Sequence, residues 1–432
     1  MPRILVMTSP ARGVMYPIVE TLLELRDRGH DIHMITIADE VPMLRGLGLS
    51  ASPLPPEIDE ALPGDWRGDD TRTPNSLTDR LLSRIDAEFT HLTAAVADHR
   101  PDMILTDVVA TGAQCAAEAS GLPWAIWSAT FLPLFTTDGP PIGLGLTPRD
   151  GRLPHLRDAV IAHAAQGIWD VTFRRKFNRA RRGFGLPELR HCDGVIRRAP
   201  LVLSLCGAPL ERPRVDWPPS VTMVGPSLWA PPGDRDPRID AIDGPIALVT
   251  CSTELQADQT LATTALEALA GTGMHAVVTT GALDPDQFVA GPDATVVRFL
   301  PHEQVLDRAS VVISHGGMGI TQKALARGIP MVIAPFGRDQ RDVAARVDAA
   351  GSGVRIEPRS MTARSLRDAV STALGRRDRA RQIAAIAPAQ GSADRAATCI
   401  ETTLHSGTAS VGTVFTRAEP TTSAGTAASN ML

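Results

Sequence analysis

Cysteine is scarce in this sequence, and its placement argues against a disulfide framework. The five cysteines are widely spread, without a CxxC pair and without a Cys/His cluster at metal-ligand spacing: Cys115, Cys192, Cys206, Cys251 and Cys399. This pattern is typical of free thiols in a reducing compartment. We therefore expect neither structural disulfide bonds nor a bound metal.

Long apolar runs are missing as well. Residues 1–7 contain one arginine followed by only four apolar residues, which is too short for the hydrophobic region of a signal peptide. Nothing later approaches the 18 uncharged apolar residues of a membrane-spanning helix. We expect a cytoplasmic protein.

The sequence also lacks an excess of positive charge. The chain has 43 Lys and Arg against 48 Asp and Glu, a formal net charge of -5, so no overall basic field attracts a phosphate backbone. Nucleic acid is therefore excluded as the principal partner. The 432 residues, 43% of them apolar, are enough for two or three domains of about 150 residues each.

The order of apolar segments predicts an α/β fold. In the first half, strand 3–7 precedes a turn at 9–13, a helix that starts at Pro17 and stops at Gly29, and strand 31–37. A second unit places helix 113–120 between strands 103–107 and 124–128. Strand, helix and strand in succession predict a parallel sheet with right-handed crossovers.

The second half repeats this order. The expected strands are 246–250, 275–280, 295–299, 310–314, 330–334 and 354–356, and helical patterns cover 259–270, 321–326 and 339–349. We expect two Rossmann-like, doubly wound domains facing a cleft, where ligands of such sheets bind. The divisions are a first domain at 1–224, a proline-rich linker at 225–244, a second domain at 245–404, and a disordered Ser/Thr/Ala/Gly tail at 405–432.

A glycine-rich segment marks the strongest candidate site. Strand 310–314 runs into His315, and the sequence Gly-Gly-Met-Gly at 316–319 then opens a helix. Unpaired N–H groups at such a helix start form an anion site, and the histidine adds a donor for phosphate. A glycine-rich turn with an incidental histidine explains the spacing equally well. Hydride transfer is less favoured, because no GxGxxG follows the first strand.

Several short segments, taken in their order, resemble family 1 glycosyltransferases of the GT-B fold. They are FLPH at 299–302, HGGMG at 315–319, GIP at 328–330, DQ at 339–340, GxxxP at 13–17, RGH at 28–30 and PD at 101–102 before a strand ending at Asp107. The resemblance covers residues 3–400. It is greatest to actinobacterial enzymes that glycosylate polyketides, macrolide antibiotics and glycolipids.

The resemblance implies a donor site for a UDP- or dTDP-sugar in the second domain, with no further cofactor. Phe299 would stack near the base, His315 and the glycine amides would hold the diphosphate, and Asp339 with Gln340 would bond sugar hydroxyls. The implied donor-binding residues are Thr250, Ser252, Thr253, Phe299, His302, His315, Gly316, Gly317, Gly319, Lys323, Asp339 and Gln340. The expected reaction is an inverting hexosyl transfer, in which the helix start and His315 stabilise the departing diphosphate without a metal.

Two positions depart from the family pattern. Val14 stands where relatives carry His or Asp as the general base, so Asp107 is the remaining candidate base. A missing base costs roughly 10² to 10⁴ in rate for an alcohol acceptor. Lys323, one of only two lysines, stands where many relatives carry Glu for the ribose hydroxyls. It either offers charge to the diphosphate or to a modified donor, or points into solvent.

The acceptor is expected in the first domain. Of 17 aromatic residues, 13 lie at or before Trp229, which favours a broad apolar pocket, although core packing explains each ring singly. The implied acceptor-binding residues are Ser9, Arg12, Gly13, Val14, Trp66, Trp127 and Phe131.

The basic run 174–182, beside Phe173 and Phe177, favours a solvated helical face over contact with an anionic membrane.

The sequence thus predicts a metal-independent, inverting glycosyltransferase that acts on a hydrophobic, secondary-metabolite, phenolic or lipid-like acceptor. Two alternatives remain: a catalytically silent nucleotide-sugar-binding or partner protein, suggested by Val14, and a nucleotide-sugar epimerase of similar fold. The acidic triplets at 234–236 and 284–286 resemble a metal-binding DxD, but both lie in expected loops, where solvated charge is the favoured interpretation.

Overall fold

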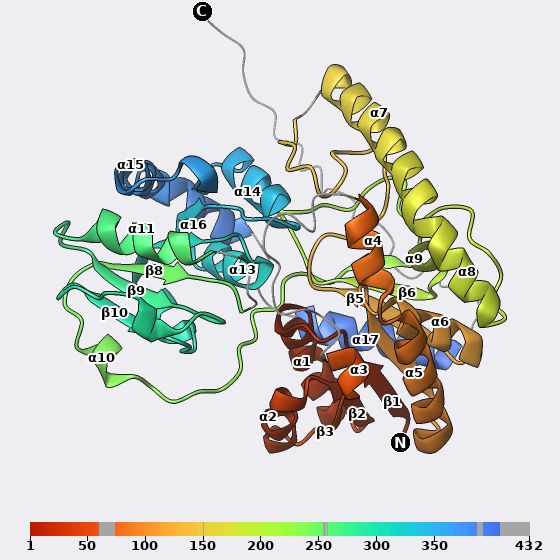
Figure 1. Cartoon of the computed structure of the whole chain (residues 1–432). Helices are drawn as coiled ribbons and strands as arrows, with labels where there is room; N and C mark the ends of the chain where they lie inside the picture. Colours follow the sequence, from red (N-terminus) through yellow and green to blue (C-terminus); the bar gives the residue numbers. More distant parts are fainter. Residues whose placement is uncertain (60–73, 150, 254–255, 257, 387–391, 407–432) are drawn as a thin grey trace, which may run out of the picture.

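The computed structural model contains two parallel sheets with helices on both sides (Figure 1), and it describes residues 1–59, 74–149, 151–253, 256, 258–386 and 392–406. The first sheet has the order β3-β2-β1-β4-β5-β6-β7 and the second the order β10-β9-β8-β11-β12-β13. All the strand pairings are parallel. The predicted fold class is confirmed.

The first sheet is built on strands that are buried on both faces, as the near-continuous apolar runs require. Its strands are β1 (Arg3–Met7), β2 (Asp31–Thr36), β3 (Ser50–Pro53), β4 (Met103–Asp107), β5 (Trp124–Ser128), β6 (Leu201–Ser204) and β7 (Val221–Met223). Its helices are α1 (Arg12–Asp27), α2 (Val41–Gly46), α3 (Pro56–Asp59), α4 (Pro74–Leu82), α5 (Ile85–His99), α6 (Thr111–Ser120), α7 (Arg152–Trp169), α8 (Arg175–Gly183) and α9 (Gly194–Arg198). Between α7 and α8 lies the π-helical turn η2 (Asp170–Arg174), and η1 (Ala38–Glu40) precedes α2.

The second sheet has the same construction. Its strands are β8 (Ile246–Thr250), β9 (His275–Thr279), β10 (Ala294–Val297), β11 (Ala309–Ser314), β12 (Met331–Ile333) and β13 (Gly353–Arg355). Its helices are α11 (Gln259–Leu269), α12 (Glu303–Leu306), α13 (Met318–Ala326), α14 (Gln340–Ala349), α15 (Ala363–Leu374) and α16 (Arg377–Ile386), with α10 (Pro237–Asp240) before the first strand. The short 3-10 turns are η3 (Pro285–Gln287) and η4 (Pro358–Ser360).

Helix α1 differs from the expected element at its start. It begins at Arg12, so Pro17 lies inside the helix and not at its first turn. The carbonyl of Ala11 accepts hydrogen bonds from the N–H groups of Val14 and Met15, which nucleates the helix upstream of the proline. Pro17 has no N–H to offer the carbonyl of Gly13, so one rung of the helix is missing. The GxxxP segment is therefore the opening of α1.

The last helix, α17 (Ser392–Ser406), packs on the first domain and not on the second. Ala396, Ala397 and Ile400 enter the core formed by α1 and the first sheet. The expected division ended the second domain at residue 404, but the core contacts of this helix lie across the domain boundary. His405 and Ser406 end the helix, while the rest of the expected disordered tail lies outside the described residues.

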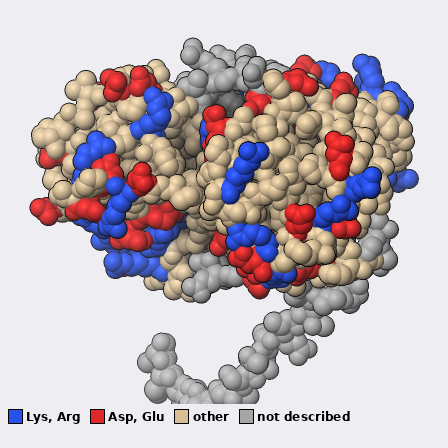
Figure 2. Space-filling view, turned by 90° about the horizontal axis from the view of Figure 1, so that it is seen from below, with Lys and Arg blue, Asp and Glu red and all other residues tan. Residues whose placement is uncertain are grey.

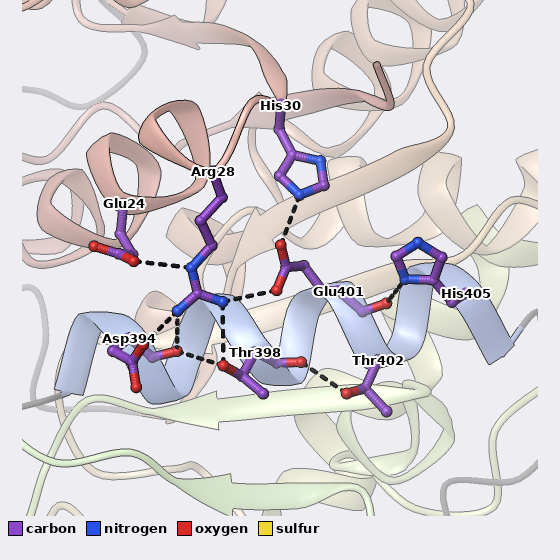
Figure 3. Close-up of polar contacts among 8 residues, drawn as sticks. All are labelled: Glu24, Arg28, His30, Asp394, Thr398, Glu401, Thr402 and His405. Carbon is purple, nitrogen blue, oxygen red and sulfur yellow. Dashed lines mark hydrogen bonds and ion pairs between the residues drawn. The ribbon is translucent and has the colours of Figure 1, made fainter.

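A polar clasp fastens α17 to the end of α1 (Figure 3). The guanidinium of Arg28 contacts Glu24 of its own helix and both Asp394 and Glu401 of α17, and His30 contacts Glu401. The Arg28–Glu401 pair measures 2.7 Å. Burial by itself raises the pKa of Glu401, but the bonds from His30 and Arg28 outweigh it and hold that pKa below its usual value.

The described residues contain no helix long and apolar enough to cross a membrane. Acidic and basic side chains are interspersed over the face shown in Figure 2, on both domains. All five cysteines are free thiols, as their spacing predicts, and Cys115, Cys206 and Cys251 are buried.

We predict that Arg28→Ala will lower the free energy of unfolding by about 1–2 kcal/mol, because one guanidinium joins three carboxylates across two helices. Urea unfolding at pH 7 measures the loss, and Arg364→Ala, an exposed arginine of α15, is the control. The lowered pKa of Glu401 means that its contribution is complete above the ordinary glutamate pKa and disappears as the pH falls through the lowered value. Equal losses for the two variants at pH 7 would contradict the clasp.

Candidate active site

The junction between β11 and α13 forms a tight, glycine-dependent corner at the carboxyl end of the second sheet. Gly316 has a φ of +92°, and a Cβ there would lie 2.9 Å from Cγ2 of Ile333. Gly317 is the N-cap of α13, so the first N–H groups of that helix have no carbonyl of an earlier turn to pair with. The corner therefore presents backbone donors and the positive end of a helix at one point.

His315 lies directly against this corner. Its ring is buried, and Nδ1 faces the carbonyl of Thr250 at 3.3 Å, so Nδ1 carries the proton in that contact. Nε2 lies beside Gly317, where a Cβ would come within 2.7 Å of it. Burial lowers the pKa of His315, Arg338 lowers it further, and Asp258 and Asp339 partly oppose them. Burial thus disfavours the charged ring, whereas an anion at the corner would favour a proton on Nε2.

The loop after β8 closes the other side of the corner. Thr250 and Ser252 are buried, whereas Thr253 is exposed. The backbone N–H of Ser252 donates to Asp258 at 2.6 Å, and Gly281 passes so close that a Cβ would lie 2.1 Å from the Ser252 carbonyl oxygen. This packing fixes the loop next to the ring of His315.

A glutamine pair extends this network to the start of α14. Nε2 of Gln340 donates to Oε1 of Gln256 at 2.7 Å, and Arg338 donates to the same oxygen at 3.0 Å. Gln256 also donates to Asp258 at 3.2 Å. Sequence reasoning did not select Gln256, Asp258 or Arg338. The signal available was a polar loop following a buried strand at the same sheet edge as His315.

Gln340 differs from its expected role as a ligand of sugar hydroxyls. Its Oε1 accepts hydrogen bonds from the backbone N–H groups of Phe336 at 2.9 Å and Gly337 at 3.1 Å, and its side chain is buried. The oxygen of the amide therefore holds the loop before α14, and its nitrogen holds Gln256 in the loop after β8. Asp339, one residue earlier, is half-buried and accepts a hydrogen bond from the hydroxyl of Thr130 in the first domain.

Helix α14 continues this contact with the first domain. Asp342 accepts hydrogen bonds from the backbone N–H groups of Gly143 at 2.7 Å and Gly145 at 3.1 Å, and burial raises its pKa. Arg346 lies over the ring of Phe131, 4.1 Å from its centroid. Asp339, Asp342 and Arg346 are spaced three and four residues apart, so one face of α14 carries the contact.

Asp107, the candidate catalytic base, is already engaged in hydrogen bonds with the backbone. The carboxylate of Asp107 is fully buried and accepts hydrogen bonds from the backbone N–H groups of Ser9, Val109 (2.7 Å) and Ala110 (3.1 Å). Burial raises its pKa, and these bonds oppose the rise. Asp107 thus holds the loop in front of α1 and presents no surface to the outside.

The other expected acceptor residues divide into two groups. Val14 is half-buried and Gly13 exposed on the first turn of α1, and Arg12 pairs with Asp39 and Glu40. Trp127 and Phe131 are core residues, which corrects their expected place in an acceptor wall. Nε1 of Trp127 donates to the carbonyl of Val14 at 3.2 Å, so the ring supports α1 from below. Trp66 lies outside the described residues.

The expected base-stacking region surrounds a buried ion pair. Phe299 is 53% exposed in the loop after β10. His302 contacts the hydroxyl of Thr279 at 3.1 Å, and burial together with nearby Lys323 lowers its pKa to about 4. Nζ of Lys323 lies 3.0 Å from Oε1 of Glu303, and the lysine side chain is largely buried. It therefore does not point into solvent, and its charge is paired with that of Glu303. Burial lowers its pKa. Gly319, on the first turn of α13, has open space around its Cβ position.

The acidic triplets serve as local caps. Asp236 accepts from the N–H of Arg238 at the start of α10 and pairs with its guanidinium. Asp284 caps η3 by accepting from the N–H of Asp286, and it pairs with Arg298. Among the described residues no group of three or more His, Cys, Asp or Glu side chains is arranged to hold a metal.

Comparison with known proteins identifies relatives of the whole chain and of its fold. Residues 264–401 match the family described as erythromycin biosynthesis protein CIII-like, C-terminal domain. The chain is 31% identical over 390 residues to 4'-demethylrebeccamycin synthase of Lentzea aerocolonigenes, covering 86% of this chain and 91% of that protein. It superposes on the glycotransferase of kitacinnamycin with a TM-score of 0.70 at 24% identity, covering 93% and 100% of the two chains. Glycosyltransferase VinC in complex with dTDP gives 0.65 at 17% identity, covering 94% and 100%.

These features define a two-domain glycosyltransferase of the GT-B fold. The chain belongs to the family of natural-product glycosyltransferases that includes 4'-demethylrebeccamycin synthase. It is therefore an enzyme that transfers sugar, and the epimerase alternative is not retained.

We predict that Gly317→Ala will displace the ring of His315, because the new methyl group meets Nε2 at 2.7 Å. We expect a loss of about 1–2 kcal/mol in the free energy of unfolding, measured with urea. Gly319→Ala is the matched control, since its Cβ meets nothing within 4 Å and alanine favours a helix by up to ~1 kcal/mol. In a His315→Ala background the cost of Gly317→Ala should vanish, and a cost that persists there would show that the glycine serves some other contact.

Proposed function

We propose that the enzyme catalyses an inverting, metal-independent transfer of a sugar from a nucleoside diphosphate to a hydrophobic acceptor. One observation carries the proposal: buried His315 lies against the amide-rich start of α13 at the carboxyl end of β11. As the bond between the anomeric carbon and the diphosphate oxygen breaks, negative charge develops on the leaving group. The helix start and a protonated Nε2 stabilise that charge, which is the function otherwise supplied by a divalent cation.

The donor is a UDP- or dTDP-sugar whose base lies at Phe299. The half-exposed ring offers a stacking face in the loop after β10. The complex of VinC with dTDP, on the same fold, supports a nucleoside diphosphate as the ligand. The five free thiols and this intracellular type of co-substrate favour a cytoplasmic location.

The acceptor is a hydrophobic group that loses its proton easily. Val14 carries no proton acceptor, and Asp107 is enclosed behind the loop that contains Ser9. An acceptor with an acidic proton, such as a phenol with a pKa near ~10, needs less help from a base than an aliphatic alcohol. Asp107 then acts by holding the loop and by its negative charge, and it takes up the proton only through an intervening water.

The silent nucleotide-sugar-binding protein that Val14 left open in the sequence is not favoured, because the chain belongs to a family of glycosyltransferases. The two candidates differ in one result. A transferase adds one sugar mass to an acceptor, whereas a binder retains the donor unchanged.

We predict that nucleoside diphosphate binding will tighten as the pH falls from 8 toward 5.5. The pKa of His315 is lowered in the free protein and rises when an anion occupies the corner, so binding takes up a proton. His315→Gln should abolish this pH dependence, and His315→Ala should weaken binding by roughly 1.5 to 3 kcal/mol, about tenfold or more. Calorimetry with dTDP and UDP measures both effects. An unchanged affinity and an unchanged pH profile in the variants would remove His315 from the site.

We predict that the wild-type enzyme transfers to phenols faster than to aliphatic alcohols, in the presence of EDTA. Val14→His should reduce this difference by supplying a base, and Asp107→Asn should slow both reactions without abolishing nucleotide binding. Mass spectrometry of the glycosylated products measures the rates. Equal rates for phenols and alcohols would refute the account of the acceptor. Loss of activity on chelation, restored by Mg²⁺ or Mn²⁺, would refute metal independence.

A further inference from the structure

A row of exposed apolar side chains runs along α7 and into η2. Five of the eleven large hydrophobic residues exposed in the described part of the chain lie here: Leu153 (80%), Leu156 (62%), Val160 (61%), Ile168 (51%) and Val171 (55%). Their separations are three, four, eight and three residues, which place them along one side of a helix. Ala164, exposed as well, fills the position between Val160 and Ile168. This set is called the α7 row below.

The opposite side of the same segment makes the contacts with the protein. Asp158, Ala162, Phe173 and Phe177 are buried, and the last two belong to the core of the first domain. The α7 row is therefore not part of the core. Figure 1 shows α7 and α8 forming one rod along the outer edge of the first domain. A row of this length is too extended to be a set of isolated surface residues and marks an interaction surface.

The charge around the row has one sign. Residues 152–183 contain eight Lys and Arg and only two Asp, in a chain whose net charge is negative. Both carboxylates are turned inward: Asp158 is buried and pairs with Arg157, and Asp170 pairs with His191 and Arg174. The exposed charges of the rod are thus cationic.

Three of these cations are exposed without an ion pair among the described residues. Lys176 pairs with Asp79 and Arg182 with Glu188, whereas Arg152 at the start of α7 and Arg175 and Arg179 of α8 have no such pair. Arg175 and Arg179 follow the α7 row directly along the rod. An apolar row that continues into unpaired arginines is the pattern of a helix lying in a membrane interface, with apolar side chains at the acyl boundary and guanidinium groups at the phosphates.

We propose that the α7–α8 rod docks the enzyme on an anionic lipid surface. A second copy of the chain fits less well, because a twofold contact places the same cationic surface on both partners and the rod exposes no carboxylate to meet it. The docking is peripheral, since α7 is not apolar enough to span a bilayer. Within the basic run 174–182 and its flanking rings, Phe173 and Phe177 are buried and Arg181 pairs with Glu118, so these residues are not part of the proposed surface. Arg175 and Arg179 of that run belong to it, together with the α7 row.

Co-sedimentation of the full chain with vesicles tests the proposal independently of sugar transfer. We expect binding at low salt to vesicles of equimolar phosphatidylglycerol and phosphatidylcholine. Binding to vesicles of phosphatidylcholine alone should be weaker by about tenfold or more. Leu156→Ser with Val160→Ser, and separately Arg175→Gln with Arg179→Gln, should each reduce the binding about tenfold or more. The matched controls are Val215→Ser with Val289→Ser, both exposed elsewhere, and Arg364→Gln with Arg377→Gln on the second domain; neither should change it.

Circular dichroism and the unfolding midpoint verify that each variant is folded. Absence of wild-type binding to the anionic vesicles would overturn the proposal, as would equal losses in the α7 row variant and its control. A concentration-dependent dimer that the α7 row variant abolishes, without vesicle binding, would assign the surface to a second copy and also overturn it.

Discussion

The site depends on the close approach between the backbone of Gly317 and the ring of His315. Only a residue without Cβ allows Nε2 to lie against the start of α13, and Gly316 in turn needs its left-handed conformation to turn the chain from β11 into that helix. The same approach buries the imidazole, and burial lowers its pKa. Backbone donors, a helix end and an imidazole nitrogen thus converge at one corner.

The remainder of the site is arranged to keep this corner rigid and to join it to the first domain. The network of Asp258, Gln256 and Gln340 ties the β8 loop to the start of α14. One face of α14 then contacts the first domain through Asp339, Asp342 and Arg346. Asp339 is the residue that the family pattern assigns to the sugar, and here its partner is Thr130. This carboxylate therefore joins the start of α14 to the first domain.

Much of the fold was predictable because the buried strands are apolar runs that end in glycine or polar turns. Strands β1, β4, β5 and β8 follow this rule, and their limits agree with the sequence-based ranges. Strand β3 reads Ser-Ala-Ser-Pro and is not an apolar run, so the sequence does not mark it as a strand. The packing of α17 on the first domain depends on contacts of Arg28 with residues about 370 positions away.

The site was predictable only at the level of the backbone. The glycine-rich corner and His315 follow from local sequence, because strand, glycines and helix start are adjacent. Side-chain partners do not follow. Lys323 pairs with Glu303 twenty residues earlier, and Gln340 divides its amide between its own loop and Gln256. Trp127 and Phe131 are as apolar as a pocket wall but are core. Each depends on which side chains the two sheets bring together, which residue spacing does not specify.

The most direct measurement of the central claim is a crystal structure of the enzyme with dTDP or UDP, grown at pH 6 without divalent cations. The account predicts the diphosphate at the start of α13, with an oxygen within hydrogen-bond distance of Nε2 of His315 and of the backbone amides of the corner. A diphosphate bound elsewhere, or at the corner with His315 turned away from it, would contradict the account.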